Sequence, residues 1–256
     1  MSMIARLILL GLCMLFAFSA RAEEEYIKPN PTSLLQTLIR FDALDINDDY
    51  LLDNYAMIAE CDLYKSFYGN DFKWNNEVRV ALRNSIRKEK NNYPILYLAH
   101  TQLQLDRYDF NENLFRFTPE TAIRSINLLL LYELQKPVCG KTAAQYIPLN
   151  YKAVLDEPVF VPGLPFEQKD AEMLLKLMKE DNNTARNIYT RFYIRIFKVK
   201  PLNVSVEGVE PRLSRRYAQA GTPGPRNIHL LAHLQTIEFF EDPAMTKLVY
   251  TYKYKP

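Results

Sequence analysis

The stretch from Phe166 to Lys200 constrains the fold most, because its hydrophobic period changes partway along. Between Ala171 and Met178 apolar residues recur at helical spacing, which predicts a short amphipathic helix. After the polar segment 181–184 the period becomes two, as in a strand with one buried face. That face carries Ile188, Phe192, Ile194 and Ile196. A helix followed by a one-sided strand is the basic unit of an α+β layer.

A similar helix-then-strand unit occurs earlier, at 71–106. We therefore predict an α+β fold in which two related helix-plus-antiparallel-strand halves form one domain. The domain is expected to span 34–256, with the halves at 71–134 and 166–256, and an N-terminal helical segment is expected to precede them.

Local patterns predict the remaining elements. Helices are expected at 48–67 and 72–90, and the alternation over 95–106 predicts a strand. The apolar run 126–134 fits either a strand covered on both faces or a short buried helix. The Pro-punctuated segment 136–164 is expected to be mostly irregular, with a short strand near Val159. Strands at 228–240 and 245–254 form a C-terminal hairpin.

The first 22 residues have the features of a secretory signal peptide. Arg6 precedes an unbroken apolar run from Leu7 to Phe18, and Ala20-Arg21-Ala22 supplies the small residues of a cleavage site. The run is shorter than the ~20 residues of a bilayer span. We expect export to the periplasm or the exterior, no membrane span after cleavage, and a flexible tether at 23–33.

Charge argues against nucleic acid as a partner. The sequence has 32 basic and 30 acidic residues. Removing the signal peptide deletes Arg6 and Arg21, so the mature chain is formally neutral. A neutral chain has no bulk electrostatic attraction for nucleic acid or acidic membranes.

Two cysteines remain after signal cleavage, Cys61 and Cys139. In an oxidising compartment the usual outcome is a disulfide, here closing a long loop. Two buried thiols are the alternative.

Aromatic and cationic side chains alternate on the polar face of the second predicted strand. They are Tyr189, Arg191, Tyr193 and Arg195. Such a face can stack sugars or bases and can contact a protein partner. A solvated sheet face held by cross-strand pairs has the same sequence pattern.

The three histidines are the candidates for a metal site. His100 and His233 end the same tripeptide, Leu-Ala-His, on two predicted strands. A zinc site would need these two on neighbouring strands together with an acidic ligand. His229 is about 13 Å from His233 if both lie on one strand, which is too far to share an ion. Ordinary strand histidines are the simpler interpretation.

Other motifs do not support a cofactor. Residues 45–49 resemble the start of a calcium loop, but Tyr50 replaces its glycine and Ala56 replaces its bidentate Glu. An acidic helix N-terminus explains them better. The chain has only seven glycines, so it is poorly equipped for phosphate cradles.

These observations favour a soluble, non-catalytic binding or interaction module of the bacterial cell envelope, without a cofactor. Its partner would be another envelope protein or an envelope component. One alternative is an envelope hydrolase with a site of histidines and carboxylates, with or without zinc. Another is a subunit of a secretion or surface assembly.

Overall fold

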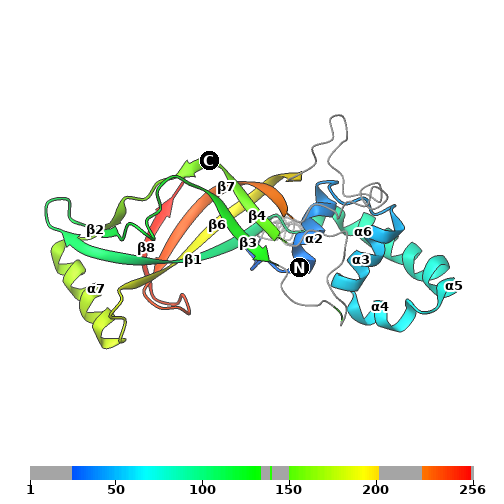
Figure 1. Ribbon diagram of the computed structural model, residues 1–256, viewed down its shortest axis with the longest axis horizontal. Helices are drawn as coiled ribbons and strands as arrows, with labels where there is room; N and C mark the ends of the chain where they lie inside the picture. The colour runs from blue at the N-terminus through cyan, green and yellow to red at the C-terminus, as the bar shows by residue number, and fades with distance from the viewer. Residues whose placement is uncertain (1–24, 134–138, 140–149, 202–226, 255–256) are drawn as a thin grey trace, which may run out of the picture.

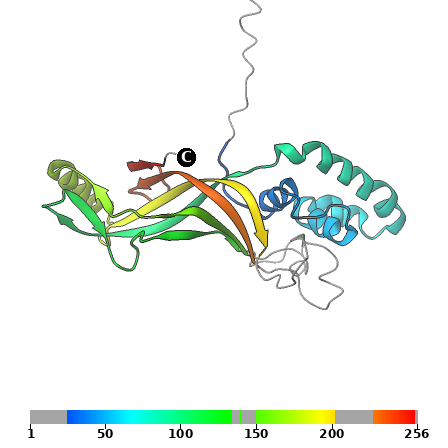
Figure 2. The same cartoon turned by 90° about the horizontal axis from the view of Figure 1, so that it is seen from above.

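A computed structural model describes residues 25–133, 139, 150–201 and 227–254 of the chain. The predicted signal peptide lies outside these ranges. Most of the helices gather at one end of an elongated molecule, a large curled sheet extends from them, and one further helix lies at the other end (Figures 1 and 2). The α+β class is confirmed. Within the described ranges, no helix combines the length and apolar character that crossing a bilayer requires.

The helices at the N-terminal end begin with α2 (Pro31–Arg40), and short elements follow it as far as β1. They are α3 (Asp49–Ala59), α4 (Cys61–Phe67), α5 (Asp71–Lys73), the π-helix η1 (Trp74–Val78), α6 (Arg79–Glu89) and the 3₁₀ helix η2 (Lys90–Asn92). Both predicted helices are therefore confirmed, and each is divided. Asp48 caps α3 by accepting from the amides of Tyr50 and Leu51.

Helix α2 joins the helices to the sheet and begins inside the predicted tether. Asn30 and Ser33 form a capping box, and Pro31 occupies the first turn. The buried Thr37 hydroxyl lies 2.6 Å from the hydroxyl of Tyr97 on β1. Ile27 also forms a parallel bridge with Tyr97. The described part of 23–33 is thus bound to the sheet, which corrects the expectation of a flexible tether.

The sheet has eight strands, in the order β3-β4-β7-β6-β1-β2-β5, with β8 also paired to β7. They are β1 (Leu96–Asp109), β2 (Leu114–Phe117), β3 (Ile126–Glu133), β4 (Asn150–Val159), β5 (Gly163–Pro165), β6 (Asn187–Pro201), β7 (Asn227–Phe240) and β8 (Leu248–Lys253). Pairing is antiparallel except between β4 and β7. The expectation of purely antiparallel pairing is therefore wrong at this one place, and the sheet is mixed.

The predicted alternation on β6 is confirmed. Ile188, Phe192, Ile194 and Ile196 are all buried in the main core. The sheet curls around this face. As a result β8 lies close to β5, at the far end of the strand order, and the hydroxyl of Tyr252 on β8 donates to the carbonyl of Gly163 on β5. Helix α7 (Gln168–Glu180) packs Ala171, Leu174 and Met178 into the same core.

Two predictions about the middle of the chain need correction. Strand β3 is not covered on both faces, since the side chains of Leu128 and Leu130 are 43% and 55% exposed. The segment expected to be irregular contains the ten-residue strand β4. Its buried residues, Tyr151, Ala153 and Leu155, alternate with more exposed ones, so β4 is also one-sided.

The two helix–strand units place β1 beside β6 as antiparallel neighbours. Their helices consequently lie at opposite ends of the molecule, α6 among the other helices and α7 at the far end of the sheet (Figure 1). A structural relation between the two halves stays a prediction.

The disulfide prediction agrees with the structure. Cys61 at the start of α4 is bonded to Cys139, with Cα atoms 5.5 Å apart and 78 residues between them in sequence. This Cα separation is typical of protein disulfides. The bond ties the helical end to the segment that follows β3.

Candidate functional site

A hollow of about 450 Å³ lies where two turns meet. One turn, 181–187, connects α7 to β6, and the other, 241–243, connects β7 to β8. Tyr189, the first of the predicted face residues, completes the lining. Its volume is within the range of ordinary small-molecule sites.

The α7–β6 turn is braced by its own side chains. The carboxamide of Asn183 accepts from the amide of Asn187 at 2.9 Å and donates to the carbonyl of Asn187 at 2.8 Å. Asn182 has a positive φ of 57°, which asparagine tolerates better than most residues. The sequence Asp-Asn-Asn thus supplies both the end of the helix and a fixed wall of the hollow.

Glu241 is the unusual residue of the hollow. It is only 4% exposed, and its Oε1 atom is buried without a hydrogen-bond partner. Burial raises the pKa of its carboxyl group, and the charge and hydrogen bond of Asp181 raise it further, although Lys247 opposes the shift. An unpaired buried carboxyl oxygen is costly, so this one needs an explanation.

The neighbouring carboxylates already have partners. Asp181 forms an ion pair with Lys247, which raises the pKa of the lysine. Asp242 accepts from the backbone amides of Thr246 at 2.9 Å and of Lys247 at 2.6 Å, so it holds the β7–β8 turn together. Glu241 differs from both in having a buried oxygen atom without a hydrogen-bond partner.

Arg191 and Tyr193, the two middle face residues, form a cross-strand network beyond Tyr189. Arg191 lies opposite Glu238 on β7, with a nitrogen–oxygen distance of 3.6 Å, and its guanidinium lies 4.6 Å from the ring centre of Phe240. The hydroxyl of Tyr193 donates to Glu238 at 2.6 Å. The two middle residues are thus engaged within the protein, and a role for the face in binding stays a prediction.

The candidate zinc pair is not brought together, so that hypothesis is wrong. His100 on β1 lies opposite Arg191, whereas His233 on β7 lies opposite Arg195. Two strand spacings and an offset of four residues separate the two histidines by about 16 Å. A single zinc ion, with ligands ~2 Å away, cannot bridge that distance.

Each histidine has ordinary surroundings. Nδ1 of His233 lies 2.6 Å from Asp156, and its ring stacks on Phe197. Burial lowers the pKa of His100 and of His229, and neighbouring cations lower both further. Across the described ranges, no three His, Cys, Asp or Glu side chains gather as a metal site would require.

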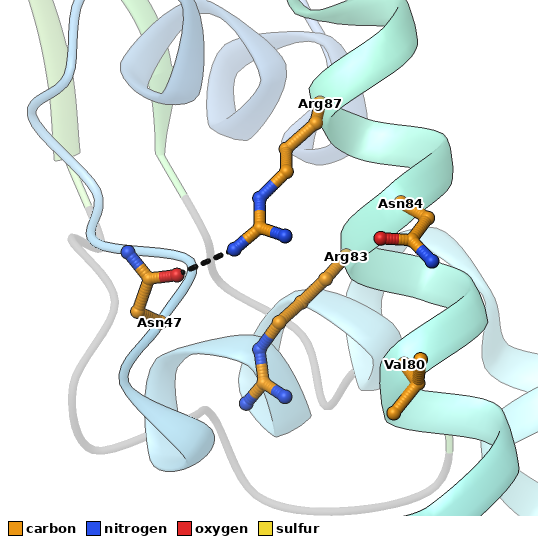
Figure 3. A pocket seen from close by; sticks show the side chains of 5 residues that line it. All are labelled: Asn47, Val80, Arg83, Asn84 and Arg87. Atoms are coloured by element: carbon orange, nitrogen blue, oxygen red, sulfur yellow. Dashed lines mark hydrogen bonds between the residues drawn. The ribbon is translucent and has the colours of Figure 1, made fainter.

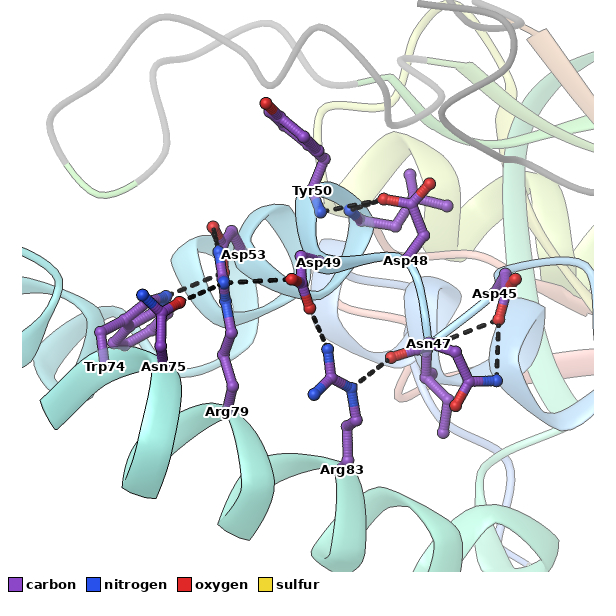
Figure 4. Close-up of polar contacts among 12 residues, drawn as sticks. Asp45, Asn47, Asp48, Asp49, Tyr50, Asp53, Trp74, Asn75, Arg79 and Arg83 are labelled. Atoms are coloured by element: carbon purple, nitrogen blue, oxygen red, sulfur yellow. Dashed lines mark hydrogen bonds and ion pairs between the residues drawn. The ribbon is translucent and has the colours of Figure 1, made fainter. Parts of the chain in front are cut away.

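The acidic segment 45–49 is structural rather than a calcium loop. Asp45 accepts from the amide of Asn47 at 3.0 Å, and Asp49 pairs with both Arg79 and Arg83 on α6 (Figure 4). The carboxylates are therefore used to cap α3 and to attach it to α6, as the acidic helix N-terminus predicted.

A second hollow, of about 370 Å³, is lined by Asn47 and by residues of α6. Arg83 and Arg87 project from α6 toward the loop before α3, where Arg87 donates to the side chain of Asn47 at 2.9 Å (Figure 3). Arg83 also donates to the carbonyl of Ile46 at 3.0 Å. Both arginines thus bind the loop to the helix, which makes this hollow the weaker candidate.

Residues 47–177 match a family described as "Domain of unknown function (DUF4852)", which is about half of the chain. The chain belongs to this family. No curated protein and no solved structure matches the chain. The segment that the family shares includes α3 to β5 and most of α7, and it ends just before the turn that carries Asp181.

The sequence pattern predicted Tyr189 as a site residue but did not predict Glu241 or Asp181. The available signal was Glu241-Asp242, two acids directly after the apolar pair Phe239-Phe240. An acid that continues the buried end of a strand is a candidate for a raised pKa. The position of Asp181 beside it depends on the β6–β7 register, which no local pattern contains.

Replacing Glu241 by Gln should change how stability depends on pH. Between the ordinary pKa of Glu and its raised folded value, the folded state retains a proton that the unfolded state has lost. Wild-type stability should fall as pH rises through this window, and Glu241→Gln should remove that loss. Thermal unfolding from pH 4 to pH 8 should show that the stability of Glu241→Gln, relative to that of the wild type, increases as the pH rises. A constant difference would contradict the raised pKa.

Proposed function

We propose that the protein is an exported binding module of the bacterial cell envelope, and that a small ligand occupies the hollow between 181–187 and 241–243. The observation that carries this proposal is Glu241, a residue that lines the hollow and whose buried Oε1 has no hydrogen-bond partner. A ligand that donates to the carboxyl group of Glu241 would reduce the cost of leaving that oxygen unpaired.

Two features support an envelope location. The N-terminal sequence has a basic residue, an apolar run and a small-residue cleavage site in the order of a secretory signal. The Cys61–Cys139 bond is of a kind that persists in oxidising compartments and is rare in the cytosol. A periplasmic or extracellular location is consistent with both features.

A hydrolase is the second candidate, and one observation favours it. Glu241 has a raised pKa and lies beside Asp181, which Lys247 holds as an ion pair. Two neighbouring carboxyl groups in unlike environments are the arrangement by which acid–base enzymes separate the roles of two acids. Binding is preferred because it needs only the unpaired acceptor and no further group.

Native mass spectrometry of the mature protein, purified gently from its host's envelope, tests the proposal. We expect the wild type to carry a non-covalent small mass and Glu241→Gln to lose it. Glu77→Gln is the matched control, because Glu77 is exposed on η1 at the helical end of the molecule.

The control variant should retain the mass. A protein free of any bound mass, or a mass held equally by wild type and Glu241→Gln, would contradict a site at this hollow. A co-purifying protein chain in place of a small mass would support the alternative of an assembly subunit.

A further inference from the structure

We infer that the ligand of this hollow is an organic cation that binds through a primary ammonium group, with Glu241 as its main acceptor. This inference rests on the proposed function and names the chemical class of the ligand. It follows from the charge of the hollow, the partners of its carboxyl groups and the burial of Glu241.

The hollow is richer in acids than in bases. Asp181, Glu241 and Asp242 all line it, and Lys247 is the cation paired with one of them. An anionic ligand would face like charge there, whereas a cation would be attracted. Charge therefore selects against phosphates and carboxylates.

The state of each acceptor argues for an ammonium rather than a metal ion. Asp181 is held by Lys247, and Asp242 is held by the β7–β8 turn. Calcium would need six to eight oxygen ligands, and one unused carboxyl group cannot supply them. An ammonium needs only a few acceptors around three N–H bonds.

The raised pKa of Glu241 fits exchange of a proton for the ligand. Burial raises the pKa of the Glu241 carboxyl and so shifts its equilibrium toward the neutral form. An incoming ammonium would make the ionised form favourable, so the carboxyl would release its proton to solvent as the ligand binds. The proton moves from Glu241 to the buffer, and no covalent bond changes.

Tyr189 supplies a second feature suited to a cation. Its side chain is half-buried at the wall of the hollow, and an aromatic face within about 6 Å of a cation stabilises it. A neutral polyol would gain from the hydrogen bonds but not from the charge or the ring. The preference for an amine over an alcohol of the same shape is therefore the decisive property.

Isothermal titration calorimetry with putrescine tests this, with 1,4-butanediol as the uncharged analogue of the same length. We expect putrescine to bind at least tenfold more tightly than the diol. Its affinity should rise with pH, by up to about tenfold per unit while Glu241 is still protonated, and level off above the folded pKa. Near that pKa the binding enthalpy should depend on the buffer, because a proton is released.

Variants separate this site from non-specific attraction. Glu241→Gln should lose at least tenfold in affinity together with the pH dependence, while Glu77→Gln should behave as the wild type does. Gln keeps the size of the side chain and cannot ionise, so the variant should fold. Unfolding curves at each pH verify that it has.

The outcomes distinguish this inference from the proposed function. Equal affinity for putrescine and the diol, no binding of putrescine, or an unchanged Glu241→Gln would overturn the amine class. If a mass that Glu241→Gln loses is nevertheless found on the envelope-purified protein, the binding function stands with a different ligand. If putrescine does not bind and the envelope-purified protein carries no such mass, the amine inference and the proposed binding function are both overturned.

Discussion

Replacing Cys61 and Cys139 together by Ser is expected to lower the free energy of unfolding by about 4 kcal/mol. The bond closes a loop with a sequence separation of 78 residues, and a loop of this length restricts the unfolded chain strongly. It also attaches α4 to Cys139, which follows β3 in the chain. Denaturant unfolding of the wild type and the double variant, at equal pH, measures the difference.

Reduction should reproduce the effect of the double variant. The wild type in a strong reductant should unfold at the same denaturant concentration as Cys61→Ser/Cys139→Ser, and the variant should not respond to reductant. If the wild type unfolds identically with and without reductant, the bond contributes nothing to stability, which would contradict the expected loss of about 4 kcal/mol.

Replacing Asp53 by Asn is expected to cost about 3 kcal/mol, or roughly 6–12 °C in Tm for a chain of this size. The carboxylate of Asp53 pairs with the guanidinium of Arg79 and accepts from the indole of Trp74 at 2.9 Å (Figure 4). The two charged side chains are only 13% and 16% exposed. Removing the carboxylate leaves a largely buried cation without its main counter-ion.

Thermal unfolding followed by circular dichroism measures this change. Asp62→Asn on α4 is a suitable control, since Asp62 is exposed in the first turn of its helix and should contribute less than about 1 kcal/mol. Equal losses in the two variants would mean that the Asp53–Arg79–Trp74 contact is not what joins α3 to α6.

The fold was predictable where a local pattern determined burial. The change of period between Ala171 and Ile196 located α7 and β6 and identified the buried face correctly. Strand β4 was missed because its prolines at 158 and 162 suggested irregular chain, although Tyr151, Ala153 and Leu155 already alternate. Its parallel pairing with β7 joins segments far apart in sequence, and no local signal encodes such a pairing.

The candidate site was less predictable for the same reason. The Tyr/Arg alternation located Tyr189 at the hollow, but the partners of Arg191 and Tyr193 come from β7. The shared Leu-Ala-His tripeptide suggested that His100 and His233 would be neighbours, whereas β6 lies between their strands. The position of Glu241 in the candidate site depends on the strand register and on burial. Neither is apparent from the residues next to it in the sequence.

The central claim is that a small envelope ligand binds where the α7–β6 and β7–β8 turns meet. Hydrogen–deuterium exchange of the mature protein, with and without the low-molecular-mass fraction of its host's envelope, tests it most directly. We predict slower exchange in peptides covering 181–189 and 240–247, and unchanged exchange in α3 and α6. Protection confined to the helical end, or no protection at all, would contradict the account.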